Sequence, residues 1–104
     1  MGWTISHGTP TGEPTTRSYG WVGTLAETLA HALTSSDWAR IQPVLQRRSG
    51  DPFTVSPAEA SIIAALLRRA AGSGLMAPEA AKDALLLADA AARAAAAGHP
   101  WQWS

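Results

Sequence analysis

The sequence predicts a helix-rich α+β fold, with three to four helices packed on a small sheet of short strands that includes both chain termini. Apolar residues recur at helical spacing over several long stretches. Three short segments, residues 3–5, 53–55 and 101–103, instead place two large apolar residues at positions i and i+2, as strands with one apolar face do. Side by side they would form one sheet that helices can cover, in a strand order that the pattern leaves open.

The composition indicates a single domain over residues 1–104. About a quarter of the chain is Leu, Ile, Val, Phe, Met or Trp and only 15% is charged, so the chain can bury a core and does not resemble a disordered tail. The absence of cysteine excludes disulfides and argues against structural zinc. Eight basic and eight acidic side chains give a formal net charge of zero. These figures bound the class of protein and name no activity.

The N-terminal part is expected to form a strand, a loop and a helix. Residues 3–5 alternate between apolar and polar side chains, which is typical of a half-buried strand. Residues 8–17 are expected to be a flexible loop, because Pro10 and Pro14 interrupt regular pairing. Apolar side chains then follow one helical face over residues 22–33.

This first helix has two candidate starts. Thr24 and Glu27 have the spacing of a capping box, while Ser18 offers a looser cap further upstream. Its end is expected at residues 34–36. The start therefore stays open between Ser18 and Thr24.

The segment 37–48 is expected to form two short helical turns separated by a break at Pro43. Ile41 and Leu45 would share a helical face in this segment. A proline inside a helix removes one backbone hydrogen bond and clashes with the carbonyl four residues earlier, at a cost of ~3 kcal/mol. The second turn is therefore expected to start at Pro43.

Two further helices are predicted from their caps. Residues 56–59 combine an N-cap serine, a proline at the first helical position and a glutamate that reaches back to the cap, and Gly72 would end that helix. The next helix is expected to run over residues 78–97 and to stop at Gly98. At 20 residues it would be ~30 Å long.

The last helix is apolar over more of its circumference than a small domain needs, which predicts an interface. Its polar side consists of charged residues with one leucine among them, namely Glu79, Lys82, Asp83, Asp89, Arg93 and Leu86. Alanine lets another helix approach closely, and an exposed apolar patch usually marks a partner site. The residues predicted to form the interface are Leu86, Ala90, Ala94 and Ala97.

Several short motifs resemble those of a family of small uncharacterised actinobacterial proteins. The motifs are Gly2-Trp3-x-Ile5-Ser6, Pro52-Phe53, Pro57-x-Glu59-Ala60, Ala88-Asp89-Ala90-Ala91-x-Arg93-Ala94-Ala95 and Pro100-Trp101-x-Trp103. The resemblance spans most of the chain. It implies no activity, because that family has none assigned.

No pattern of catalytic or metal-binding residues stands out. Glu27 and His31 have a spacing that matches no metal motif, and the sequence has only three histidines and no cysteine. No Gly-x-Ser-x-Gly elbow occurs. Residues 72–77 match a bare G-x-G-x-x-A, but a helix precedes them where a dinucleotide site needs a strand. We expect no enzyme activity, no metal and no cofactor.

The leading functional interpretation is a non-enzymatic protein-interaction or regulatory module, either a homo-oligomer or a small adaptor. The alanine-rich last helix and five tryptophans in the chain support it, because aromatic side chains often anchor interfaces. The partner is therefore expected to be another protein or a second copy of the chain.

Nucleic-acid binding is the first alternative. The segment 40–69 is locally basic, and its arginines would make a phosphate-binding face if they converged in space. The simpler interpretation is that arginines at helix ends complement helix dipoles. The arginines concerned are Arg40, Arg47, Arg48, Arg68 and Arg69.

Ligand binding at the tryptophan-rich end is the second alternative. If the terminal strands are neighbours, two histidines would lie near three indoles and could bind an anion or another ligand, or a partner. The simpler interpretation is that the tryptophans are core residues and the histidines are solvated. The residues of this end are Trp3, His7, His99, Trp101 and Trp103.

A cytoplasmic protein without a membrane partner is expected. The N-terminus lacks the basic start and apolar stretch of a secretory signal. The most apolar segment, residues 84–97, is interrupted by Asp89 and Arg93 and is shorter than the ~20 residues that span a bilayer.

Overall fold

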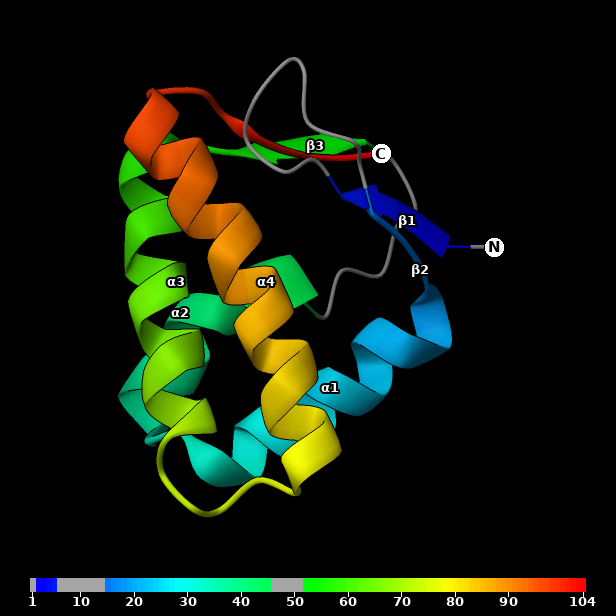
Figure 1. The fold of residues 1–104 in the computed structure, drawn as a ribbon, viewed down its shortest axis with the longest axis vertical. Helices are drawn as coiled ribbons and strands as arrows, with labels where there is room; N and C mark the ends of the chain where they lie inside the picture. The colour runs from blue at the N-terminus through cyan, green and yellow to red at the C-terminus, as the bar shows by residue number, and fades with distance from the viewer. Residues whose placement is uncertain (1, 6–14, 46–51) are drawn as a thin grey trace.

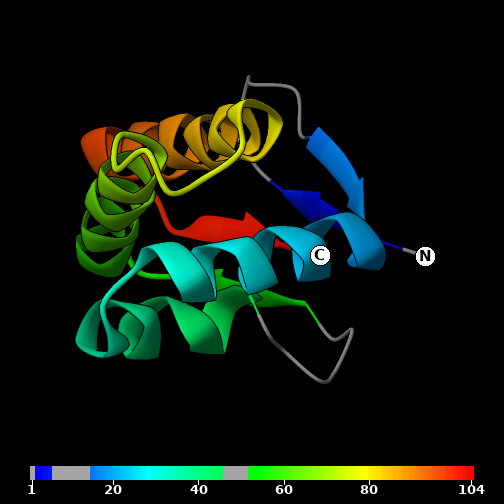
Figure 2. The same cartoon turned by 90° about the horizontal axis from the view of Figure 1, so that it is seen from below.

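The computed structural model describes residues 2–5, 15–45 and 52–104. They form four helices gathered on one side of a four-stranded antiparallel sheet with the strand order β2-β1-β4-β3 (Figures 1 and 2). This confirms the helix-rich α+β fold and the presence of both chain termini in the sheet. In chain order the elements are β1 (Gly2–Ile5), β2 (Thr15–Ser18), α1 (Tyr19–Ala32), α2 (Ser35–Leu45), β3 (Phe53–Val55), α3 (Pro57–Ala71), α4 (Pro78–Ala97) and β4 (Trp101–Trp103).

The sheet brings the two ends of the chain together. β4 lies between β1 and β3, with Ile5 opposite Trp103 and Val55 opposite Trp101. Next to this register, the Thr4 amide donates to the Ser104 carbonyl at 2.7 Å, and the Ser104 amide donates to the Thr4 carbonyl at 2.9 Å. The strand formed last along the chain is therefore an inner strand of the sheet.

β2 corrects the loop expected over residues 8–17. Thr15–Ser18 pairs antiparallel with β1, so the C-terminal part of the expected loop is a strand. Threonine favours strands, and both prolines of the segment precede residue 15, so they remove no amide from this strand. Residues 8–14 lie outside the described residues.

The pairing of β1 with β2 requires a glycine at position 2, because a Cβ there would collide with the backbone carbonyl oxygen of Arg17. We expect Gly2→Ala to lower the free energy of unfolding by about 1–3 kcal/mol. The matched control is Gly23→Ala inside α1, where no neighbouring group lies within 4 Å of the new Cβ. In the control, the free energy of unfolding should rise by about 0.5–1 kcal/mol, because alanine favours the helix more than glycine does. Urea denaturation measures both, and a Gly2→Ala variant as stable as the parent would contradict the close approach.

α1 begins at the earlier of its two candidate caps. Ser18 is the N-cap, and its Oγ accepts a hydrogen bond from the Trp21 amide at 3.0 Å. The helix ends at Ala32, before the expected residues 34–36. The reason lies in the next helix, since the hydroxyl of Thr34 accepts from the Asp37 amide at 3.2 Å and caps α2 instead.

α2 runs through Pro43 without the predicted break. Pro43 lies in the last turn of the helix, where the missing amide costs one hydrogen bond, the one to the carbonyl of Ala39. Ala39 and Pro43 are both exposed, so water can satisfy that carbonyl. Ile41 and Leu45 are buried, and this packing holds the helix together.

α3 and α4 confirm the cap-based predictions. The Ser56 hydroxyl accepts from the Glu59 amide at 3.2 Å, and α3 ends before Gly72. α4 covers the predicted residues and ends at Gly98, whose φ of 68° is the left-handed conformation that favours glycine. The two helices pack along each other (Figure 1). None of the described helices combines the length and the apolar character needed to cross a bilayer.

Candidate functional site

The tryptophan-rich end, predicted as a ligand or partner surface, is part of the core. Trp3, Trp101 and Trp103 are only 5%, 0% and 0% exposed. The Trp103 ring stacks on Phe53 at a centroid distance of 5.6 Å and meets Trp3 and Trp101 edge-on at 5.9 and 5.2 Å. Strand alternation places these rings on the face that the helices cover, which confirms the simpler interpretation of the tryptophans as core residues and rules out the ligand or partner surface. They cannot contact a partner.

Of the two histidines predicted at that end, the structure describes one. His99 is exposed in the connection between α4 and β4, while His7 lies outside the described residues. Without exposed indoles beside it, His99 is a solvated side chain. Within the described part of the chain, no group of three or more His, Asp or Glu side chains is placed to hold a metal ion.

The described arginines of the predicted nucleic-acid segment are each paired with an acidic side chain. Every pair joins two different helices at the surface, and each neutralises its arginine locally. Phosphate binding requires a concentrated basic face, and these acidic partners reduce the positive charge at the three positions. The pairs are Arg40–Glu59 at 4.0 Å, Arg68–Asp89 at 3.2 Å and Arg69–Asp37 at 3.0 Å. Arg47 and Arg48 lie outside the described residues, and the nucleic-acid alternative stays a prediction.

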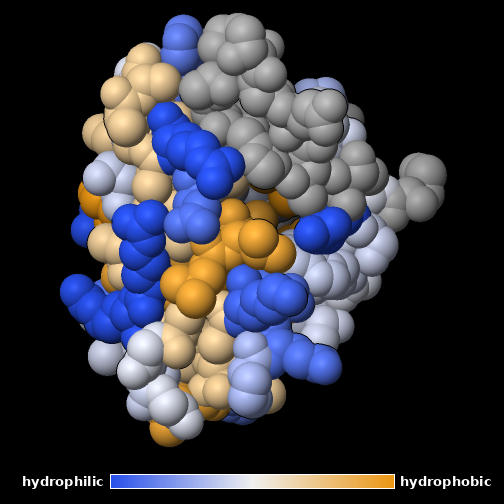
Figure 3. All heavy atoms as spheres, viewed as in Figure 1, coloured by the Kyte–Doolittle hydropathy of each residue, from blue (hydrophilic) through white to orange (hydrophobic). Residues whose placement is uncertain are grey.

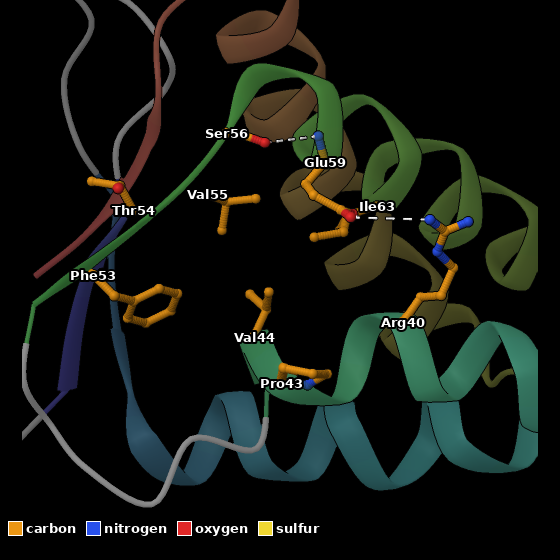
Figure 4. A pocket seen from close by; sticks show the side chains of 9 residues that line it. All are labelled: Arg40, Pro43, Val44, Phe53, Thr54, Val55, Ser56, Glu59 and Ile63. Atoms are coloured by element: carbon orange, nitrogen blue, oxygen red, sulfur yellow. Dashed lines mark hydrogen bonds and ion pairs between the residues drawn. The ribbon is translucent and has the colours of Figure 1, made fainter.

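An open groove of about 290 Å³ lies between α2, β3 and the start of α3 (Figure 4). Its walls are mainly apolar, and three of its four polar residues bind one another, since Ser56 caps the Glu59 amide and Arg40 pairs with the Glu59 carboxylate. Arg40 is the one residue of this groove that the sequence analysis names as a binding residue, and it does so only for nucleic acid. The apolar lining consists of Pro43, Val44, Phe53, Val55 and Ile63.

Two of the four residues predicted to form an interface on α4 are buried, and two are exposed. Ala90 and Ala94 are only 4% and 0% exposed, so they belong to the core of their own chain and cannot form an interface. Their small side chains let neighbouring elements approach α4 closely, which covers them. Leu86 is 46% exposed and Ala97 is also exposed. The accessible part of the helix is therefore centred on leucine and not on alanine.

The surface of α4 that faces solvent carries an apolar patch surrounded by charges. Leu85 and Leu86, 43% and 46% exposed, lie in the middle of the helix. Figure 3 shows this hydrophobic patch at the centre of the molecular face, with hydrophilic side chains around it. We call this surface the α4 outer face and define it by Glu79, Lys82, Leu85, Leu86, Asp89 and Arg93, all of which are exposed.

Leu85 is the residue of this face that sequence reasoning missed. It lies three residues after Lys82 and four before Asp89, which places all three on adjacent positions of one helical surface. This spacing is the signal in the sequence that could have identified Leu85 as a residue of the exposed face. An apolar residue flanked at i−3 and i+4 by charges belongs to the solvent side of a helix.

Fold and surface together define a small helix-rich α+β protein whose last helix presents an apolar patch to solvent. The chain belongs to the family described as Domain of unknown function (DUF7739), whose model matches residues 8–104. This confirms the expectation of an uncharacterised family. No curated protein and no solved structure shows a significant match to the chain.

Proposed function

We propose that the chain is a non-enzymatic protein-interaction module that binds its partner through the α4 outer face. The observation that carries this proposal is the pair of exposed leucines, Leu85 and Leu86, at the centre of that face. Burying apolar surface contributes about 25 cal/mol per Å², so a partner that covers both side chains gains affinity. An apolar centre with a polar rim is also the usual anatomy of a protein interface.

The remainder of α4 suits this role, because the helix is fixed before any partner arrives. Its opposite side is buried along its length, including Ala84, Ala88 and Ala91 at 0% exposure. Gly98 ends the helix in a defined left-handed cap. A surface held rigid in the free protein loses little conformational entropy on binding.

The compartment and the source belong to the same proposal. The proposed compartment is the cytoplasm. The excess of arginine over lysine and the abundance of alanine fit a GC-rich genome, such as that of an actinobacterium.

A photoreactive amino acid at position 86 tests the proposal in cells of the source organism. We expect irradiation to attach the chain to one discrete protein, because the side chain at this position would be covered by the partner. The matched control carries the same group at Ser61, an exposed position on α3. Absence of an adduct from position 86, or the same adducts from position 61, would contradict the proposal.

A further inference from the structure

Five residues of the α4 outer face form a stripe along the helix. Their spacing of three, four, three and four residues is the heptad spacing that keeps side chains on one side of an α-helix. All five are exposed. Along the stripe the side chains are negative, positive, apolar, negative and positive, in the order Glu79, Lys82, Leu86, Asp89 and Arg93.

This stripe is complementary to itself when a second copy lies antiparallel. Glu79 and Arg93 are both seven residues from Leu86, while Lys82 and Asp89 are four and three residues from it. Each residue advances a helix by about 1.5 Å. An antiparallel copy centred on Leu86 therefore places Glu79 opposite the partner's Arg93. It also places Lys82 opposite the partner's Asp89, with an offset along the helix axis of only about 1.5 Å.

A parallel arrangement of two copies in register lacks this match. A parallel pair in register would place each charge opposite its own copy, so that all four charged positions repel. The antiparallel pair gives four opposite-charge contacts, because a two-fold axis generates each of the two kinds twice. The leucines meet at the axis, where they are removed from water on both sides.

We propose that the partner of the α4 outer face is a second copy of this chain, bound through an antiparallel α4–α4 contact with its two-fold axis at Leu86. This inference rests on the proposed function, to which it adds the identity and orientation of the partner. Leu85 lies beside Leu86 and widens the apolar centre. Asp89 keeps its pair with Arg68, made through Oδ1 at 3.2 Å, because a carboxylate can accept from more than one donor.

The dimer is weak and salt-sensitive. One helix pair covers less surface than the ~800 Å² per partner of a standard stable interface. Its ion pairs are exposed to solvent at the rim, so added salt weakens their attraction. Self-association should therefore be measured at protein concentrations from about 1 µM to about 1 mM, the range in which the dissociation constant of a weak dimer lies.

A charge swap tests the antiparallel pairing by sedimentation velocity of the purified chain. Glu79→Arg alone and Arg93→Glu alone each place like charges opposite one another, and each should weaken self-association about tenfold, which corresponds to 1.4 kcal/mol. The double variant Glu79→Arg/Arg93→Glu restores opposite charges with reversed polarity. It should recover the parent affinity to within about twofold, since each contact again pairs unlike charges.

Folding is checked separately for every variant. Because Glu79 and Arg93 are exposed, we expect the circular dichroism spectra of the single and double variants to match that of the parent. A double variant that folds but associates no better than the single variants would overturn the antiparallel arrangement.

A cysteine at the axis gives an independent readout, because the chain has no cysteine of its own. Leu86→Cys should form a disulfide-linked dimer under mild oxidation much faster than Ser61→Cys, which lies away from the contact. Equal rates would overturn the proposal.

The outcomes also separate this inference from the proposed function. If the chain stays monomeric at about 1 mM while the photoreactive group at position 86 attaches to a different protein, the interaction surface stands and self-association is wrong. If the chain stays monomeric and position 86 attaches to nothing, both proposals fail.

Discussion

Trp101→Ala is expected to remove a large part of the stability of the protein. The side chain is fully buried at the start of β4, where it packs edge-on against Trp103 at a ring distance of 5.2 Å. Truncating a buried tryptophan costs about 3–5 kcal/mol, because it loses apolar burial and leaves a cavity. The total free energy of unfolding of a native domain is only about 5–15 kcal/mol. Urea denaturation followed by far-ultraviolet circular dichroism measures the loss.

The control for this substitution lies on the neighbouring strand β3. Thr54 is exposed, so Thr54→Val keeps a β-branched side chain in the strand without changing the core. Its free energy of unfolding should stay within about 0.5 kcal/mol of the parent value. If Trp101→Ala were as stable as Thr54→Val, the tryptophan cluster would not be the core that the burial indicates.

Ala88→Leu is expected to give the second largest effect. Ala88 is fully buried on α4, so the added carbon atoms have no space and must push neighbouring elements away. Overpacking of this kind costs about 1–3 kcal/mol. Thermal denaturation should show a lower midpoint for the variant.

Ala96→Leu is the matched control, because Ala96 lies on the same helix but is exposed. The same chemical change at this position should shift stability by no more than about 0.5 kcal/mol. Equal effects at positions 88 and 96 would show that the cost comes from the helix itself and not from the packing against it.

Features set by local chemistry could be predicted from the sequence. The start of α3 follows from the serine, proline and glutamate around Ser56, and the end of α4 follows from Gly98. The alternation of residues 3–5, 53–55 and 101–103 predicted three strands of the sheet. In each case the signal lies within a few residues of the feature that it specifies.

Features set by distant parts of the chain could not be predicted in the same way. β2 exists because residues 15–18 pair with β1, and no strong apolar alternation marks it. The continuity of α2 depends on how close Pro43 lies to the helix end, which the sequence alone leaves open. The burial of Ala90 and Ala94 depends on which elements cover α4.

The candidate site shows the same division. Leu86 could be found among the charges of the polar side, since helical spacing alone places it there. The ion pairs of Arg68 and Arg69 join residues 21 and 32 positions apart, so only the folded chain reveals them. The core position of the three tryptophans was the simpler of two interpretations, whereas the strand order that brings their rings together could not be derived from the sequence.

The inner position of β4 also bears on how the protein is made. β1 and β3 are synthesised before β4, and neither can pair with it in the centre of the sheet until residues 101–103 have left the ribosome. The nascent chain must therefore hold Trp3, Ile5 and Val55 without their final cover until β4 emerges. Folding is expected to complete only after release of β4, and a truncation that removes Trp101–Trp103 would leave a chain prone to capture by chaperones or proteases.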